Sequence, residues 1–325
     1  MTAGDYEKRN DGFYYIKYTS DGIKTIKLSN FTATITAELN EDDGEHATEG
    51  AYLISGEVSG AQLPEIRVPC VEYEAMKWVE TQWRGRATVM AGYGCRDHLR
   101  AAIKLSSNPS RIPVYKHTGW RRIDDRWVYL HAGGGIDESG QVDGIQCSYS
   151  GELAKAVLPD PPSGGDLLNC VNASYWTRAI MNDEPAGLLV MLAPYAAVLD
   201  ELLGLDFGVW FVGPPRSKKS AVTAIIQGHF GLGFTKDRWM ASWTSTDNAL
   251  EAAAHRAKDM PFVIDDYRPE QSRFDDLAQQ KKADRIFRGK HNHAGRERMR
   301  ADTSARPVYT PRGLPISSAE ALPQS

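Results

Sequence analysis

The sequence has few cysteines and no cysteine motif. Cys70, Cys95, Cys147 and Cys170 are scattered over 325 residues, with no C-x-x-C pair among them. This spacing argues against a cysteine-based zinc site and against a framework of disulfide bonds. The first residues, MTAGDYEKRND, are polar and lack the pattern of a signal peptide. We therefore expect a protein of the reducing cytoplasm.

Long hydrophobic runs are also missing. The most apolar segment, residues 187–213, is interrupted by Pro194, Asp200, Glu201 and Asp206. A helix that crosses a membrane needs roughly 20 consecutive apolar residues, so we expect no membrane partner. The segment instead predicts a buried helix followed by a buried strand.

The chain has no excess of positive charge, because its formal net charge is −4. Any contact with nucleic acid would therefore have to come from a local patch. A hydrophobic share of 42% and a charged share of 25% are typical of a globular protein. A chain of 325 residues exceeds the usual size of one hydrophobic core, so we expect two domains.

Alternating apolar and polar residues dominate the first half, as in FYYIKY and FTATITAEL, with helical patterns near 71–83 and 96–105. A hairpin is expected at 117–136, where Trp120, Trp127 and Tyr129 form either a base-stacking platform or part of the hairpin's packing. The segment LPDPPSGG at 158–165 has the composition of a linker. We therefore predict a β-rich α+β N-terminal domain over 1–160 and a second domain over 166–325.

The second half predicts helices alternating with short buried strands. Helices are expected near 167–181, 186–203, 219–230 and 247–258, and strands near 207–212, 261–264 and 313–317. Strands that alternate with helices favour crossover connections and a parallel sheet. The chain ends soon after the last strand, which is consistent with a core truncated at its C-terminus.

The octet GPPRSKKS follows the apolar run FGVWFV and precedes the helical pattern AVTAIIQGHF. A strand, a tight turn and a helix whose first N–H groups face an anion form the setting of a phosphate-binding loop. Lys219 would reach the β- and γ-phosphates of a nucleotide, and the Ser220 hydroxyl would ligate Mg²⁺. The residues expected to contact the phosphates are Gly213, Pro214, Pro215, Arg216, Ser217, Lys218, Lys219 and Ser220.

The segment PFVIDDY at 261–267 supplies the second half of such a site. A short apolar strand ends there in two carboxylates, Asp265 and Asp266. In a nucleoside triphosphatase the first carboxylate holds the Mg²⁺ shell and the second polarises the attacking water. Together and in this order, the two motifs predict a P-loop domain that binds ATP and Mg²⁺.

More of the second half resembles one family. The segments GPPRSKKSAVTA, SWTSTDNALEAAAHRAKDMPFVIDDYRP and PRGLPISSAE are similar to domain-of-unknown-function family 927, helicase-like proteins of phage, plasmid and mobile-element replication. The similarity extends to HTGWRR and HAGGGI in the first half. It implies an α/β P-loop NTPase with a RecA-like or AAA-like parallel sheet, acting on DNA.

The resemblance also assigns residues. Lys219 and Ser220 fall on the loop's lysine and hydroxyl, and Asp265 falls on the aspartate near Mg²⁺. Asp266 stands where such proteins often have glutamate. Ser317, Ser318 and Glu320 match the family's S-T-G-E, with Ser318 and Ala319 replacing its threonine and glycine. Polar residues at the end of that strand would sense the γ-phosphate.

Two positions leave alternatives open. Lys218 occupies the slot where the loop pattern has its second glycine, so it must adopt the turn geometry that glycine normally supplies. The cluster TSTDN at 244–248 either caps the following helix through Thr246 or Asp247, or belongs to the site together with Glu251 as an alternative base.

Positive charge is concentrated between residues 281 and 312. Ten cations there face three carboxylates, Asp284, Glu297 and Asp302; the cations are Lys281, Lys282, Arg285, Arg288, Lys290, Arg296, Arg298, Arg300, Arg306 and Arg312. We interpret the tract as a mobile loop that faces DNA, with one arginine available to a neighbouring subunit's γ-phosphate. The simpler alternative is a solvated surface loop.

These observations predict an ATP-dependent helicase or translocase that binds DNA, most simply single-stranded, and forms a homo-oligomeric ring. Its catalytic residues would be Lys219, Asp265, Asp266 and Ser317, with Ser220 and Asp265 at the metal. A degenerate DNA-binding scaffold without turnover is the alternative, favoured by Lys218 and Asp266. A small-molecule kinase with the same loop is a third class, against which the basic tract argues.

Overall fold

The computed structural model describes residues 2–20, 22–45, 50–269, 272–295 and 308–323. The chain divides into two compact units, the first formed by residues 1–42 and 47–114 and the second by residues 43–46 and 115–325. The segment 158–165, expected to be a linker, lies inside the second unit.

The first unit is β-rich, as the alternating sequence patterns predicted. Its first sheet has four antiparallel strands, β1 (Thr2–Ala3), β2 (Tyr6–Arg9), β3 (Gly12–Thr19) and β4 (Gly22–Lys27). In a second sheet the strands follow the order β8 (Ser110–Tyr115), β5 (Thr32–Asp42), β6 (Ala51–Val58) and β7 (Ala61–Pro69). Aromatic and aliphatic side chains, among them Phe31, Trp78 and Trp83, form one core beneath these sheets.

The helices of this unit only partly follow expectation. The helix expected near 96–105 is α2 (Cys95–Leu105). The one expected over 71–83 is broken into α1 (Cys70–Tyr73), the π-helical turn η1 (Val79–Trp83) and the 3-10 turn η2 (Arg84–Arg86). The break has a local cause, because Met76 adopts a left-handed conformation with φ of 53° that cannot continue a right-handed helix.

The second unit begins with a small antiparallel sheet. It contains β9 (Gly119–Ile123), β10 (Arg126–His131), β11 (Gly134–Asp137) and β12 (Gly140–Val142). Asp124 and Asp125 form the tight turn between β9 and β10, as the hairpin pattern predicted, and both have positive φ. A short strand β13 (Gln146–Cys147) and a turn η3 (Gly151–Lys155) follow.

The rest of this unit alternates helices with short parallel strands. The helical elements are α3 (Gly164–Trp176), η4 (Thr177–Ile180), α4 (Glu184–Val198), α5 (Asp200–Leu203), α6 (Lys219–Gly228), α7 (Asp247–Arg256) and α8 (Arg273–His291). The strands are β14 (Val209–Val212), β15 (Ala241–Ser242), β16 (Pro261–Tyr267) and β17 (Leu314–Ala319). They pair in parallel in the order β14–β17–β16–β15.

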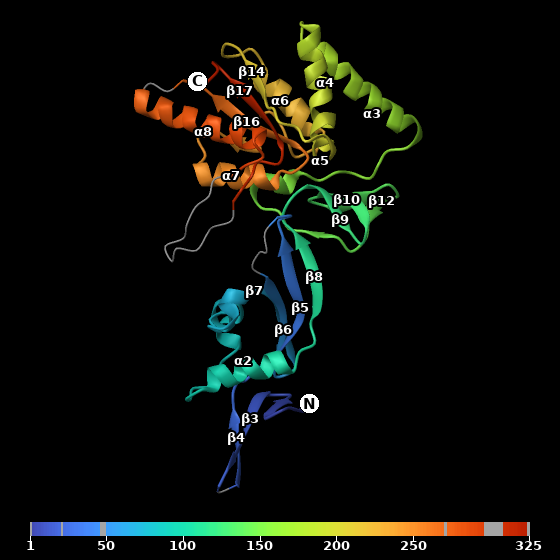
Figure 1. The fold of residues 1–325 in the computed structure, drawn as a ribbon. Helices are drawn as coiled ribbons and strands as arrows, with labels where there is room; N and C mark the ends of the chain where they lie inside the picture. The colour runs from blue at the N-terminus through green and yellow to red at the C-terminus, as the bar shows by residue number, and fades with distance from the viewer. Residues whose placement is uncertain (1, 21, 46–49, 270–271, 296–307, 324–325) are drawn as a thin grey trace. The chain divides into compact units, whose positions relative to one another are not determined.

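Both faces of this parallel sheet are covered, which explains why its strands read as continuous apolar runs. On one face, α4 and α6 pack against alternate strand residues such as Val263 and Ile316. On the other face, α7 and α8 pack against Phe262 and Ile264. Figure 1 shows α7 and α8 on the other side of these strands from α4 and α6. Successive strand residues therefore belong to two different cores, one on each side of the sheet.

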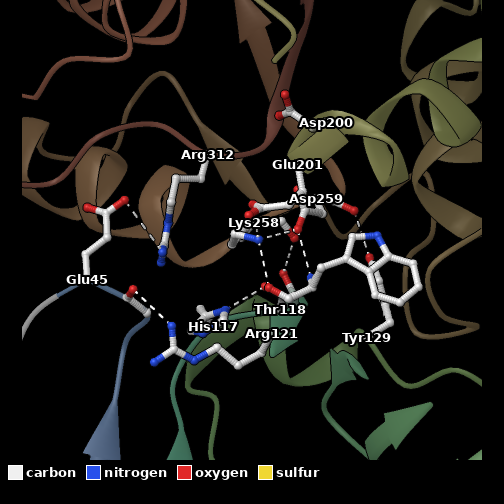
Figure 2. A network of polar contacts seen from close by, with 12 residues as sticks. Glu45, His117, Thr118, Arg121, Tyr129, Asp200, Glu201, Lys258, Asp259 and Arg312 are labelled. Carbon is white, nitrogen blue, oxygen red and sulfur yellow. Dashed lines mark hydrogen bonds and ion pairs between the residues drawn. The ribbon is translucent and has the colours of Figure 1, made fainter. Parts of the chain in front are cut away.

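Polar contacts attach strand β9 to the turn between α7 and β16 (Figure 2). The Lys258 ammonium donates to the Trp120 carbonyl at 2.8 Å and to the Asp259 carboxylate at 2.6 Å. The Trp120 N–H donates to the same carboxylate at 2.8 Å, and the Thr118 hydroxyl donates to the Lys258 carbonyl at 2.9 Å. The motif HTGWRR thus docks the small sheet beside the first residue of β16.

Candidate functional site

The loop between β14 and α6 makes a tight turn around two left-handed residues. Arg216 has φ of 65°, and Lys218, the residue before α6, has φ of 64° and ψ of 16°. For residues with a Cβ this conformation costs about 1–2 kcal/mol. Lys218 therefore adopts the conformation for which the loop pattern has glycine, with a strain that glycine would not have.

Lys219 is the first residue of α6, and its side chain folds back over its own loop. The ammonium donates to the Gly213 carbonyl at 2.7 Å, to the Pro214 carbonyl at 2.8 Å and to the Ser217 hydroxyl at 3.2 Å. A cation is thus held at the concave side of the turn, beside the helix N-terminus, where the helix dipole also favours an anion.

Asp265 receives hydroxyl groups from two other elements. Its Oδ1 accepts from the Ser220 Oγ at 3.1 Å and from the Ser318 Oγ at 2.5 Å. The strand order causes this convergence, because β17 lies between β14 and β16 and the carboxyl ends of parallel strands meet at one edge of a sheet. The loop and the acidic strand, 45 residues apart in sequence, are joined directly by the Ser220–Asp265 hydrogen bond.

The two serines at the end of β17 have different neighbours. The Ser318 hydroxyl, besides donating to Asp265, accepts from the Asp266 N–H at 3.0 Å. The Ser317 hydroxyl accepts from the indole N–H of Trp243 at 2.9 Å and donates to the Ser318 carbonyl at 3.1 Å. The structure therefore brings Ser318 to Asp265, whereas Ser317 lies against Trp243. This contact of Trp243 could not be predicted from the sequence.

Asp266 lies beside Asp265 but leaves the regular strand. The pairing of β16 with β17 shifts register between Ile264 and Tyr267, and Asp266 has φ of 63°. About half of its side chain is exposed, and its carboxylate is 3.9 Å from the Arg268 guanidinium. Burial and the nearby Asp276 carboxylate raise the pKa of the neighbouring Tyr267 to about 12, so that phenol stays neutral at physiological pH.

The polar cluster before α7 is a helix cap. Thr246 is the N-cap of α7, and its hydroxyl accepts from the Ala249 N–H at 3.4 Å. Glu251, considered as an alternative base, is buried and forms an ion pair with Arg285 at 3.2 Å. Although burial opposes the charge of Arg285, hydrogen bonds to Asp247 and Glu251 raise the pKa of this guanidinium.

The prediction of a mobile DNA-facing loop is wrong for residues 281–291, which form the second half of helix α8. Lys282 donates to the carbonyls of Trp243 and Ser245. Lys290 is buried and forms an ion pair with Asp200. These cations are turned toward the protein, as Arg285 is.

Arg312, at the other end of the tract, is also engaged. Its guanidinium donates to the carbonyls of His255 and Asp43 and lies 3.7 Å from the Glu45 carboxylate (Figure 2). Burial lowers the pKa of Arg312, although these acidic neighbours oppose the shift. Arg288 is exposed and pairs with Asp284 of the same helix at 2.5 Å. The other four arginines, Arg296, Arg298, Arg300 and Arg306, lie outside the described residues.

The described residues contain neither a helix that could cross a membrane nor a cluster of side chains that could bind a metal ion by themselves. In this part of the chain, no helix is both long and apolar enough to cross a membrane. The same residues contain no group of three or more His, Cys, Asp and Glu side chains placed to hold a metal ion. A magnesium site at the loop would therefore rest on Ser220 and Asp265 together with a nucleotide's own oxygens.

Comparison with known proteins agrees with the resemblance seen in the sequence. A solved structure described as "SCCmec type IV Cch - active helicase" matches with a TM-score of 0.52 and 13% identity. The match covers 99% of this chain and 55% of that one, so this chain spans about half the length of its neighbour. At this identity the likeness is one of fold, and no protein of curated function matches the chain.

A family model matches part of the second unit. The model described as "Domain of unknown function (DUF927)" matches residues 174–279, a segment that contains the loop, Asp265 and Asp266. The resemblance to family 927 that the motifs indicated is thereby confirmed over residues 174–279.

Proposed function

We propose that the second unit is a P-loop nucleoside triphosphatase that binds ATP with Mg²⁺ and acts on DNA as a helicase or translocase. The observation that carries this proposal is the hydrogen bond of 3.1 Å from the Ser220 hydroxyl to the Asp265 carboxylate. It joins the start of α6, beside the Lys219 ammonium, to the end of the acidic strand. The fold likeness to a helicase supports the same assignment.

The residues at the loop fit a magnesium-bound triphosphate. Mg²⁺ prefers oxygen ligands and is commonly held by one or two protein oxygens together with phosphate oxygens and water. The Ser220 hydroxyl and the Asp265 carboxylate provide such oxygens at one point. The carbonyl and hydroxyl groups that now accept from Lys219 are exchangeable partners, since a phosphate oxygen is a stronger acceptor for an ammonium group.

Each side chain then has a distinct task. Lys219 binds phosphate oxygens and offsets negative charge as it develops, and Ser220 and Asp265 hold the metal, which supplies electrostatic stabilisation of the transferring phosphoryl group. Asp266 orients the attacking water. The Ser318 hydroxyl positions Asp265, and Ser317 fixes the end of β17 through Trp243.

The DNA partner and the assembly are further parts of the proposal. The helicase-like fold favours nucleic-acid binding, and we propose single-stranded DNA as the substrate and a homo-oligomeric ring as the active form. Among the tract's described cations, Lys281 and Arg288 are exposed on α8, and we propose that they act with the arginines of 296–306.

A degenerate DNA-binding scaffold without turnover is the second candidate. It is favoured by the backbone of two residues, since Lys218 and Asp266 both adopt left-handed conformations. The first strains the loop, and the second moves the carboxylate that would orient the water out of the regular strand.

Hydrolysis of ATP with and without single-stranded DNA, measured on the full chain, tests the proposal. We expect DNA-stimulated turnover in the wild type and a loss of about a hundredfold or more in Lys219→Ala, because a charge aimed at the transition state is removed. Lys236→Ala is the matched control, since Lys236 is an exposed lysine of the same unit outside the loop.

Three other results would contradict the proposal in different ways. If the wild type and both variants bind DNA but none hydrolyses ATP, the protein is a DNA-binding scaffold. Turnover that survives in Lys219→Ala would show that another site hydrolyses ATP. Stimulation by a metabolite rather than by DNA would indicate a kinase.

A further inference from the structure

A cavity of about 730 Å³ lies in the second unit, away from the phosphate loop. Its walls come from the β9–β12 sheet on one side and from α4 and the residues after α6 on the other. None of residues 213–220 lines it. Its volume is within the range of roughly 300–1,000 Å³ that small-molecule sites have.

The sheet side of the cavity is a row of large side chains. Trp120, Tyr129 and Ile136 are directly opposite one another on three adjacent strands, so they share one face of the sheet. Trp127 is two residues before Tyr129 on β10 and therefore lies on the same face. Half of the Trp127 surface is exposed, whereas only 6% of Tyr129 is. Trp127 is thus an aromatic wall with an uncovered side.

The polar atoms of this wall are already satisfied within the protein. The Trp120 indole N–H donates to the Val198 carbonyl at 2.9 Å. The Tyr129 hydroxyl donates to the Asp259 carbonyl at 2.8 Å (Figure 2). A molecule bound in the cavity would therefore contact mainly the carbon atoms of these rings.

The helical side has the same character. The Tyr195 hydroxyl donates to the Ser174 hydroxyl at 2.7 Å. One ring nitrogen of His229 is 3.1 Å from the same Ser174 hydroxyl, and the other is 2.9 Å from the Ile225 carbonyl. Pro194 and Phe230 complete this side with apolar surface. Recognition inside the cavity must therefore come from aromatic and apolar faces.

The charged residues that line the cavity are mostly negative. Asp125, Asp137 and Glu138 line it together with one cation, Arg126. The side chain of Asp137 is buried, whereas Asp125, Arg126 and Glu138 are exposed and form the rim. Arg126 pairs with Asp137 at 3.1 Å, and Arg122, which does not line the cavity, pairs with Asp125 at 3.0 Å. With both arginines counted, the carboxylate of Glu138 remains in excess.

We propose that this cavity binds a small planar aromatic cation. The faces of tryptophan and tyrosine attract cations, and desolvated sites strengthen that attraction. The excess carboxylate at the rim adds to it, whereas the same charge repels the phosphates of a nucleic acid. The three aromatic residues of the hairpin therefore form a ligand cage rather than a base-stacking platform.

Calorimetric titration of the full chain with proflavine, a planar aromatic monocation, tests this inference. We expect binding of one dye per chain that Trp127→Ala weakens about tenfold or more, because one stacking face is lost. Glu138→Gln should weaken it about threefold, as expected for a rim charge in contact with solvent. Trp176→Ala, which removes an exposed tryptophan of α3, is the control and should change nothing.

Thermal melts of each variant confirm that it folds, which the exposed positions of Trp127 and Glu138 favour. An aromatic anion, 1-anilinonaphthalene-8-sulfonate, should not compete with proflavine. Unchanged affinity in Trp127→Ala, tighter binding in Glu138→Gln or displacement by the anion would overturn the inference. So would displacement of proflavine by MgATP, which would place the dye at the phosphate loop.

Discussion

Replacing Gly119 by alanine is the sharpest test of how the small β9–β12 sheet is attached to the rest of the second unit. Gly119 has φ of 89° and lies at the start of β9. A Cβ at this position would be 2.5 Å from the Asp259 Oδ2 and 2.6 Å from the Lys258 carbonyl oxygen. Both distances are shorter than any ordinary contact of a methyl group.

The neighbours of Gly119 cannot move away easily. The carbonyl of Lys258 is backbone, and the Asp259 carboxylate is held by the Trp120 N–H and the Lys258 ammonium. Burial raises the pKa of Asp259. The charge of the Lys258 ammonium, and the hydrogen bonds that the carboxylate accepts from Lys258 and from the Trp120 N–H, oppose that shift. A carboxylate displaced from these donors would be buried with fewer partners, which is costly.

The expected magnitude follows from two separate contributions. A left-handed conformation of a residue with a Cβ costs about 1–2 kcal/mol, and overpacking of a rigid site costs about 1–3 kcal/mol. We therefore expect Gly119→Ala to lower the free energy of unfolding by about 2–5 kcal/mol. This is a large part of the roughly 5–15 kcal/mol that stabilises a typical domain.

Gly144→Ala separates the two contributions. Gly144 has a similar φ of 80°, but a Cβ there would meet nothing within 4 Å. It should cost only the backbone term of about 1–2 kcal/mol. Urea denaturation gives the stabilities, and hydrogen exchange of β9 and β16 localises the loss, which is needed because two units need not unfold together. Equal losses in both variants, or unchanged exchange in β9, would refute the reasoning.

Two further predictions concern the loop and the basic tract. Lys218→Gly should stabilise the protein by up to about 1 kcal/mol, because glycine adopts the left-handed conformation without strain. Thermal denaturation measures this change. A loss of stability would show that contacts of the Lys218 side chain compensate for the strain. Four of the tract's ten cations, Lys282, Arg285, Lys290 and Arg312, contact other segments of the protein, which leaves at most six for phosphates. One of the six, Arg288, pairs with the exposed Asp284 on the same helix. The dependence of log affinity for single-stranded DNA on log salt should therefore have a slope no steeper than about −4, and a slope near −7 would show that all ten bind phosphates.

The loop and the acidic strand could be predicted because their signals are local. In each case an apolar run of strand length precedes the polar residues, which places Lys219 and Asp265 at strand or helix ends without knowledge of the sheet. The hydrogen bond between Ser220 and Asp265 shows that the two ends meet. The roles of these residues toward a nucleotide remain predictions.

Helix α8 could not be predicted because its buried face is partly polar. The residues it buries, Gln279, Ala283, Ile286 and Lys290, have helical spacing, but two of them are polar and hide the apolar pattern. The acids that pair with Lys290 and Arg285 come from distant segments, since Asp200 is 90 residues from Lys290 and Asp247 is 38 residues from Arg285. Read along the sequence alone, these cations form an unpaired basic run.

The choice between Ser317 and Ser318 shows a limit of a different kind. Neighbouring residues of a strand point to opposite faces, so a shift of one residue in the pairing exchanges which hydroxyl faces the acidic strand's carboxylate. The register is fixed by the pairing of Ser317 with Ile264 and of Ser318 with Phe211, contacts between segments far apart in sequence. A motif match can locate the serine pair. Only the pairing of the strands determines that the Ser318 hydroxyl contacts Asp265 and that the Ser317 hydroxyl contacts the indole of Trp243. Substituting Ser318 should therefore disturb Asp265 directly, whereas substituting Ser317 acts through the packing of the strand.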